Sequence, residues 1–233
     1  MEKRDIDTPM MSTLLQLPLF QGLTVNQLMD ILEKVRPDFF TVTDGYVARQ
    51  RDKHDQMLFL LKGRLCREYR DPSGRFTFTE TLDSTRLLEA GSMFGRMAEY
   101  EASYRADGRA SLLAFNKKYM FSVFNRFDIV QLNMLNLLSA HAQAIQDKLR
   151  DTLGGDDVTC FRTFINNLSE VHTGAKRLEA TRHELAMMFG CSQRRLSDHI
   201  VAWAKAGLLD AAYSCITIHD LTQFNAATLA QRM

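Results

Sequence analysis

Alternating hydrophobic and polar residues predict a chain that begins with one helix and continues in short strands. Thr24 and Gln27 have the spacing of a capping box, and apolar residues at helical intervals follow as far as Pro37. Between residues 39 and 115 the pattern changes to short apolar or β-branched runs that end in turn residues, which is typical of antiparallel strands. This region predicts an antiparallel sandwich or roll.

Two turn sequences divide the strand region further. Lys62-Gly63 separates an apolar run at 57–61 from a second run at 64–70 and predicts two paired strands. Asp71-Pro72-Ser73-Gly74 predicts a tight turn, because proline presets φ and glycine accepts a positive φ. Residues 75–80 then alternate apolar and polar side chains, as a half-buried strand does.

A long helix is predicted between residues 121 and 153, where the hydrophobic period becomes helical. Its apolar stripe consists of Leu135, Leu138, Ala142, Ile145 and Leu149. The intervals of three and four residues are those of a coiled-coil seam. Ordinary core packing produces the same spacing, so the pattern leaves an internal face and a dimer seam both open.

Residues 154–157, Gly-Gly-Asp-Asp, break this helix and indicate a domain boundary. Beyond them, Thr181 repeats the capping-box spacing with Glu184, and Gly190 suits a left-handed turn position. Ser192 is placed to cap a further helix, whose inward face would consist of Leu196, Ile200 and Trp203. Two short helices joined at a glycine predict a helix-turn-helix.

A small β-wing is expected after the second of these helices. Leu208-Leu209 and the run Cys215 to Ile218 are the two segments that would pair to form it.

Composition excludes several classes of protein. The chain has 233 residues, 45% of them hydrophobic, with 29 Lys and Arg against 28 Asp and Glu, which is typical of a globular protein and excludes a histone-like basic one. No apolar run is long enough to span a membrane, and residues 1–12 lack the pattern of a signal peptide. We therefore expect a cytoplasmic protein without a membrane partner.

The four cysteines are Cys66, Cys160, Cys191 and Cys215, and no two of them form a CxxC pair. This spacing argues against a zinc site, a redox motif and a disulfide framework. We expect buried thiols and no metal site.

The order of these segments resembles the Crp/Fnr family of bacterial transcription regulators over essentially the whole chain. The residues that carry the resemblance are Phe20-Gln21-Gly22-Leu23, 57–63, 71–74, 91–95 and, above all, 181–186 with 189–192. The resemblance implies an α+β fold with an N-terminal antiparallel β-roll (1–120), a long dimerisation helix (121–153) and a C-terminal winged helix-turn-helix (154–233). It also implies a homodimer on palindromic double-stranded DNA, RNA polymerase as a partner and no enzymatic activity.

The family pattern places the DNA-reading residues at the start of the second helix. The candidates for base edges are Gln193, Arg194, Arg195 and Asp198, which follow Ser192. The candidates for phosphates are Thr181, Arg182, Lys176 and Arg177. The better-known members have Glu where Arg194 stands and Arg where Asp198 stands, so we expect a different operator. Residues 176–195 contain five Lys or Arg against two Glu, a local basic patch.

The effector region departs from the cyclic-nucleotide-binding members of the family. Those members follow Phe-Gly with Glu, a ribose acceptor, and later have Arg-Ser/Thr-Ala for the phosphate. Here the candidate pocket residues are Gly95, Arg96, Met97, Ala98, Arg105 and Ala106. Because Arg96 replaces the Glu, we expect an effector other than cyclic AMP.

Other cofactors of the family find little support in the sequence. No cysteine precedes Cys66, so an iron–sulfur cluster is not expected, and a lone His54 or His141 does not indicate haem. Two further interpretations stay open: a DNA-binding dimer that is ligand-independent or controlled by a partner protein, and, remotely, a cupin-like enzyme. The cupin reading lacks the His-x-His metal ligands that such chemistry uses.

Overall fold

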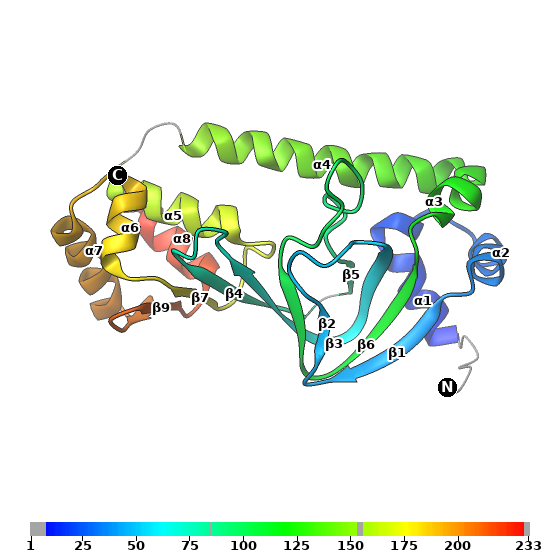
Figure 1. Ribbon diagram of the computed structural model, residues 1–233, viewed down its shortest axis with the longest axis horizontal. Coiled ribbons are helices and arrows are strands. Elements are labelled where there is room, and N and C mark those ends of the chain that lie inside the picture. The colour runs from blue at the N-terminus through cyan, green and yellow to red at the C-terminus, as the bar shows by residue number, and fades with distance from the viewer. Residues whose placement is uncertain (1–7, 84, 153–155, 231–233) are drawn as a thin grey trace. The chain divides into compact units, whose positions relative to one another are not determined.

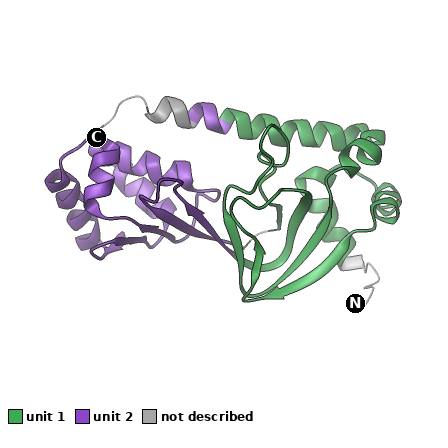
Figure 2. Cartoon of the chain, viewed as in Figure 1, with its two compact units in different colours: residues 1–65, 83–143 green, residues 66–82, 144–233 purple. Residues whose placement is uncertain are grey.

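The computed structural model describes residues 8–83, 85–152 and 156–230. The chain divides into two compact units (Figures 1 and 2). The N-terminal unit comprises residues 1–65 and 83–143, and the C-terminal unit comprises residues 66–82 and 144–233. The boundaries expected from the sequence place residues 66–82 in the roll, whereas here this hairpin belongs to the C-terminal unit.

The N-terminal unit is an antiparallel roll with short helices before and after its strands. Its first helices are α1 (Thr8–Gln16), η1 (Pro18–Phe20) and α2 (Val25–Val35). Its strands are β1 (Asp38–Thr43), β2 (Tyr46–Ala48), the first part of β3 (Gln56–Arg70), β5 (Arg86–Leu87) and β6 (Ser103–Asn116). After β6 come α3 (Tyr119–Ser122), η2 (Phe124–Arg126) and the long helix α4 (Asp128–Thr152).

Strand β6 organises the pairing of this unit. It pairs antiparallel with β1 from Asp38 opposite Ala114 to Thr43 opposite Arg109, and its other half pairs with β2. Four phenylalanines, Phe20, Phe59, Phe115 and Phe124, fill the core with ring centroids 5.3 to 6.4 Å apart. The capping box of Thr24 and Gln27 at the start of α2 is confirmed.

The hairpin predicted at Lys62-Gly63 is wrong. Strand β3 runs through this dipeptide without interruption. Gly63 has a φ of 97°, and a Cβ on it would lie 2.3 Å from the carbonyl oxygen of Arg109. Glycine is therefore required at this position because β6 approaches closely. In the sequence, a glycine required for close packing looks the same as a glycine required in a turn.

The C-terminal unit builds a small sheet and a helical layer. Its strands are β4 (Thr77–Leu82), β7 (Lys176–Glu179), β8 (Leu209–Ala211) and β9 (Cys215–Ile218), in the order β4-β7-β9-β8. Its helices are α5 (Asp157–Leu168), α6 (Arg182–Phe189), α7 (Gln193–Lys205) and α8 (Leu221–Ala230), together with the end of α4. The expected pairing of the two wing segments is confirmed, with Leu209 opposite Ile218.

The hairpin between β3 and β4 extends this sheet. Its turn is confirmed: the amide of Gly74, at a φ of 75°, donates to the carbonyl of Asp71 over 2.8 Å. Strand β4 then pairs antiparallel with β7, from Thr77 opposite Glu179 to Glu80 opposite Lys176. Segments almost a hundred residues apart in sequence thus form one ladder next to the first helix of the helix-turn-helix.

Aromatic side chains join three helices of this unit, α5, α7 and α8, to one another. Trp203 is 1% exposed and lies 5.2 Å, between ring centroids, from both Phe161 and Phe224. Leu196 and Ile200 are fully buried beside it, as the sequence predicts.

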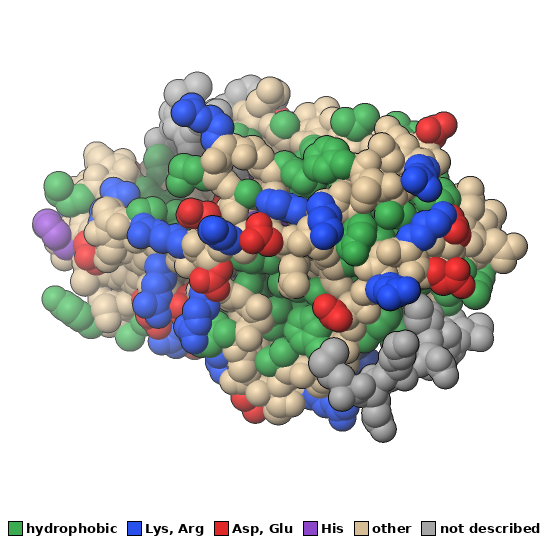
Figure 3. All heavy atoms as spheres, turned by 45° about the vertical axis from the view of Figure 1, so that its right-hand side comes forward, with side chains coloured by type: hydrophobic (Ala, Val, Ile, Leu, Met, Phe, Trp, Pro, Cys, Tyr) green, Lys and Arg blue, Asp and Glu red, His purple; other side chains and the backbone are tan. Residues whose placement is uncertain are grey.

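Two remaining features of the structure are the cysteine thiols and the charges on its surface. All four cysteines are free, and each is half-buried rather than buried as expected. On the face that Figure 3 shows, Lys and Arg side chains are interspersed with Asp and Glu, as the near-zero net charge implies. Within the described residues, no helix combines the length and apolar character needed to cross a membrane.

Candidate nucleic-acid interface

The helix-turn-helix is fixed by local hydrogen bonds that its own sequence supplies. The Thr181 hydroxyl accepts from the amide of Glu184 over 3.2 Å, and the Glu184 carboxylate accepts from the amide of Thr181 over 2.7 Å. Gly190 ends α6 with a φ of 63°, and the Ser192 hydroxyl accepts from the amide of Arg195 to begin α7. These contacts confirm the predicted caps and set the direction of α7.

Helix α7 presents polar side chains of its first two turns to solvent. Leu196, Ile200 and Trp203 are buried on its inner face. The side chains that remain exposed are Gln193, Arg194, Arg195 and Asp198. A helix held by its inner face, with a guanidinium and an amide at its exposed N-terminal end, has the geometry needed to read base edges in a major groove.

The two neighbouring arginines of α7 differ in their contacts. Nη2 of Arg195 lies 2.9 Å from Oδ2 of Asp157, at the first turn of α5, although the Arg195 side chain is 64% exposed. No salt bridge holds Arg194 among residues 8–83, 85–152 and 156–230. Arg194 can therefore bind a ligand without breaking an ion pair. Arg195 must first break its ion pair with Asp157.

Strand β7 changes the set of candidate phosphate contacts. Lys176 was expected to meet a phosphate, but its side chain is 1% exposed and its Nζ lies 2.8 Å from Oε2 of Glu80. This prediction is wrong, because Lys176 occupies an inward position of β7, with the exposed Arg177 next to it. Arg177 pairs with the exposed Glu179 over 2.9 Å. Arg182 is partly buried at the start of α6.

Lys176 belongs to a buried ion cluster that the sequence reading missed. The cluster consists of Arg67 on β3, Glu80 on β4, Glu170 after α5 and Lys176 on β7. Glu80 has a fully buried side chain, and its Oε1 lies 3.1 Å from Nη1 of Arg67. The Glu80 carboxylate also accepts from the amides of Glu170 and Val171 over 2.8 and 3.3 Å. Two cations and two carboxylates balance, so the buried charges are compensated.

A signal for this cluster is present in the sequence. Phe76, Phe78, Glu80 and Leu82 occupy the inward positions of an alternating strand. A charged residue at a core-facing position requires a buried partner. The alternating pattern therefore indicates that Glu80 is a buried charge, but it does not identify Lys176 as its partner.

The candidate effector residues do not converge on the interior of the roll. Arg96 and Met97 are exposed, Met97 to 75%. On β6, Tyr104 and Ala106 are fully buried and Arg105 between them is exposed, so the Arg105 side chain faces outward. Arg105 therefore does not offer an inward guanidinium for a phosphate.

A buried hydrogen-bond chain lies beside this loop instead. Glu89, whose φ is 43°, accepts from the amides of Glu101 and Ala102 over 2.7 and 2.9 Å and from the Tyr104 hydroxyl over 2.9 Å. Ser92 donates to Glu89 over 2.8 Å and lies 3.2 Å from Nδ1 of the fully buried His54. Burial raises the pKa of Glu89 against the opposing effect of these hydrogen bonds. The chain fixes the start of the loop.

His54 makes the stability of the N-terminal unit depend on pH. Burial and, secondly, the charge of Lys117 lower the pKa of His54 from 6.5 to about 4. The unfolded chain therefore binds more protons than the folded one between these pH values, and stability falls as the pH falls from 6.5 toward 4. We expect the free energy of unfolding to lose about 1.4 kcal/mol per pH unit from this group.

Urea denaturation of the wild type and of His54→Gln across this pH range checks the expectation. Both proteins retain Glu89, so the difference between their two curves isolates His54. The stability difference should change in favour of His54→Gln as the pH falls, and two parallel curves would contradict the assignment.

Helix α4 carries an apolar stripe that its own chain leaves partly uncovered. Among the predicted seam residues, Leu135 is 61% exposed, Ile145 is 45% exposed, and Leu138 packs partly against the core. Leu132, one turn before Leu135, is 52% exposed. The side chain of Leu149 lies outside the described residues. Large exposed aliphatic groups recurring along one helix make this surface a candidate protein–protein contact.

Comparison with known proteins supports the architecture. No protein-family model and no curated protein matches the chain. The sensor domain of the transcriptional regulator DNR from Pseudomonas aeruginosa is similar at a TM-score of 0.50 and 22% identity, over 58% of this chain and 90% of that one.

Two longer structures cover more of the chain. The c-di-GMP-responsive regulator CLP from Xanthomonas campestris has a TM-score of 0.49 and 16% identity over 84% of this chain and 99% of that one. The catabolite activator protein of Thermus thermophilus has a TM-score of 0.45 and 18% identity, over 91% and 99%. At these identities the likeness is one of fold, and the DNR sensor domain shares the fold of the part of this chain that it covers.

Proposed function

We propose that this chain is a sequence-specific DNA-binding transcription regulator of the Crp/Fnr type that acts as a homodimer on a palindromic operator. The observation that carries the proposal is α7, whose inner face is buried and whose first two turns expose Gln193, Arg194, Arg195 and Asp198. Three further features support the proposal: the fold, the β-wing and the partly uncovered apolar stripe of α4. The test is selection of binding sites from random duplexes with the purified protein.

The base-contact residues imply an operator of their own. Arg194 favours a guanine, through two hydrogen bonds to its O6 and N7, and Gln193 favours an adenine. Asp198 accepts hydrogen bonds and favours the amino group of a cytosine. Since the better-known family members carry the opposite charges at positions 194 and 198, this protein selects a half-site other than TGTGA.

Arg194→Ala should weaken binding to the selected operator by roughly 5- to 150-fold, because it removes a bidentate contact worth about 1–3 kcal/mol. Fluorescence anisotropy at fixed salt measures the change. Lys205→Ala, which removes the same charge from the other end of α7, is the matched control and should leave affinity within about twofold. Equal losses in the two variants would mean that α7 contributes general charge and does not read bases.

Binding should also depend strongly on salt. Each phosphate contact that Arg177 or Arg182 supplies adds about 0.9 to the slope of log affinity against log salt. Arg177→Ala should therefore lower this slope by about one without changing the preferred sequence, and an unchanged slope would remove Arg177 from the phosphate contacts.

We further propose that the effector of the roll is not cyclic AMP. Arg96 stands where the family's ribose acceptor would be, and Arg105 faces outward from β6. The buried carboxylate beside this loop, Glu89, is already hydrogen-bonded to two amides and two hydroxyl groups. Calorimetry with cyclic AMP should show no binding at micromolar concentration, and a saturable micromolar isotherm would overturn the proposal.

A further inference from the structure

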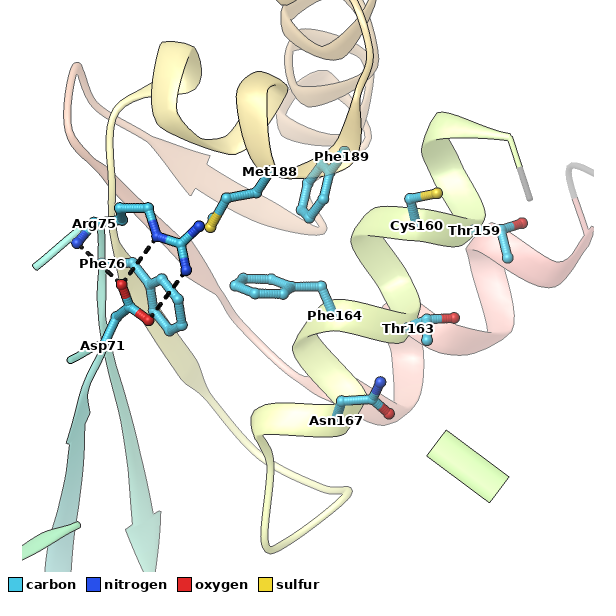
Figure 4. Close-up of a pocket in the computed structure, with 10 residues that line it drawn as sticks. All are labelled: Asp71, Arg75, Phe76, Thr159, Cys160, Thr163, Phe164, Asn167, Met188 and Phe189. Carbon is cyan, nitrogen blue, oxygen red and sulfur yellow. Dashed lines mark hydrogen bonds and ion pairs between the residues drawn. The ribbon is translucent and has the colours of Figure 1, made fainter. Parts of the chain in front are cut away.

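A cavity of about 500 Å³ lies within the C-terminal unit. The turn between β3 and β4, helix α5 and the last residues of α6 surround it (Figure 4). Its volume falls in the range of roughly 300–1,000 Å³ that small-molecule sites occupy. The residues of the proposed DNA contact do not line it.

One wall of the cavity is aromatic. Phe164 points from α5 toward Phe76 of the hairpin (Figure 4), with ring centroids 5.1 Å apart and planes at 74°. Phe189 lies 5.3 Å from Phe164, and Met188 beside it completes the wall. Phe164, Phe189 and Met188 are only half-buried, although the neighbouring Phe161 is fully buried. Such a wall can contact a flat apolar ligand through the faces and edges of its aromatic rings and through a thioether.

The polar groups around the cavity carry no net charge. Nε of Arg75 donates to Oδ2 of Asp71 over 3.0 Å, and this contact holds the pKa of Asp71 at about 2. Burial raises the pKa of the Cys160 thiol, which therefore stays protonated at neutral pH. Within the described residues, the buried Oγ1 of Thr159 has no hydrogen-bond partner. This hydroxyl oxygen is not accessible from the cavity, and Figure 4 shows it turned away from the aromatic wall.

We propose that this cavity binds a small, uncharged, planar aromatic molecule. The aromatic wall selects a flat ring, and the Asp71–Arg75 ion pair leaves the lining without a net charge that would attract an anionic ligand. Because Met188 and Phe189 directly precede the turn of the helix-turn-helix, a ligand here touches the segment that positions α7. This site would be a second input, independent of the roll.

Isothermal titration of the full chain with 2-naphthol at pH 7 tests the proposal. We expect saturable binding at one site per chain and a raised Tm. Met188→Trp fills the cavity and should weaken binding at least tenfold, and Cys160→Phe, which fills it from α5, should repeat the loss. The matched control is Met187→Trp, since Met187 is the adjacent residue of α6, is 72% exposed and does not line the cavity, so binding should be unchanged.

2-Naphthoate, which has the same ring system with a negative charge, separates ligand classes. It should bind at least tenfold more weakly than 2-naphthol. Absence of 2-naphthol binding, equal binding by the wild type and by both filled variants, or tighter binding of 2-naphthoate would each overturn the proposal. Circular dichroism melts of the three variants verify that each is folded before titration.

Discussion

Replacing Glu80 by alanine is expected to lower the free energy of unfolding of the C-terminal unit by about 3–5 kcal/mol. The change leaves Lys176, at 1% exposure, and Arg67 with no carboxylate on β4 in an interior that water does not reach. Removing one partner of a buried ion pair costs this much because the remaining charge stays desolvated. It also removes the acceptor of two backbone amides after α5. Chemical denaturation followed by fluorescence of Trp203, the single tryptophan, reports this unit specifically.

Glu179→Ala is the matched control for this experiment. Glu179 lies on β7 and pairs with Arg177 over 2.9 Å, but the two side chains are 48% and 54% exposed. Solvent screens such a pair, so its loss should cost under about 1 kcal/mol. If the two variants unfold at the same denaturant concentration, the cluster around Glu80 does not hold the hairpin on the sheet.

Replacing Leu135 by aspartate is expected to convert the proposed dimer into a monomer and to weaken operator binding by at least about 100-fold. Leu135 is 61% exposed in the single chain, so the fold of that chain loses little. In a helix–helix seam the same position would bury an unpaired carboxylate. The loss of DNA affinity follows because two linked half-site contacts gain about 10²- to 10⁴-fold over one.

Sedimentation equilibrium and anisotropy on one operator measure the two effects together. Leu229→Asp, on α8, makes the same change at a leucine that is 52% exposed and should leave both quantities as in the wild type. A Leu135→Asp protein that remains dimeric would show that α4 does not form the seam.

The features that the sequence predicted correctly depend on neighbours close in the chain. The capping boxes at Thr24 and Thr181, the left-handed Gly190 and the turn at Asp71 are each set by residues within a few positions, and each is confirmed. The inward faces of α2 and α7 follow from helical periodicity in the same way.

The features that were missed depend on contacts between distant segments. Lys176 was predicted to contact a phosphate because no residue near it in the chain indicates that it is buried. Its burial depends on β4, almost a hundred residues earlier, which places Glu80 opposite it. Gly63 was predicted to be a turn residue because the residues around it in the chain give no sign that Arg109 of β6 approaches it. The ion pair of Arg195 with Asp157 likewise needs α5 and α7 to be packed together.

Selection of duplexes from a random pool by the purified wild-type protein tests the central claim most directly. We predict enrichment of a two-fold symmetric site with half-site centres about 10–10.5 base pairs apart, in which guanine positions lose their preference when Arg194→Ala is used instead. Failure to enrich any sequence, or enrichment of TGTGA half-sites, would contradict the account.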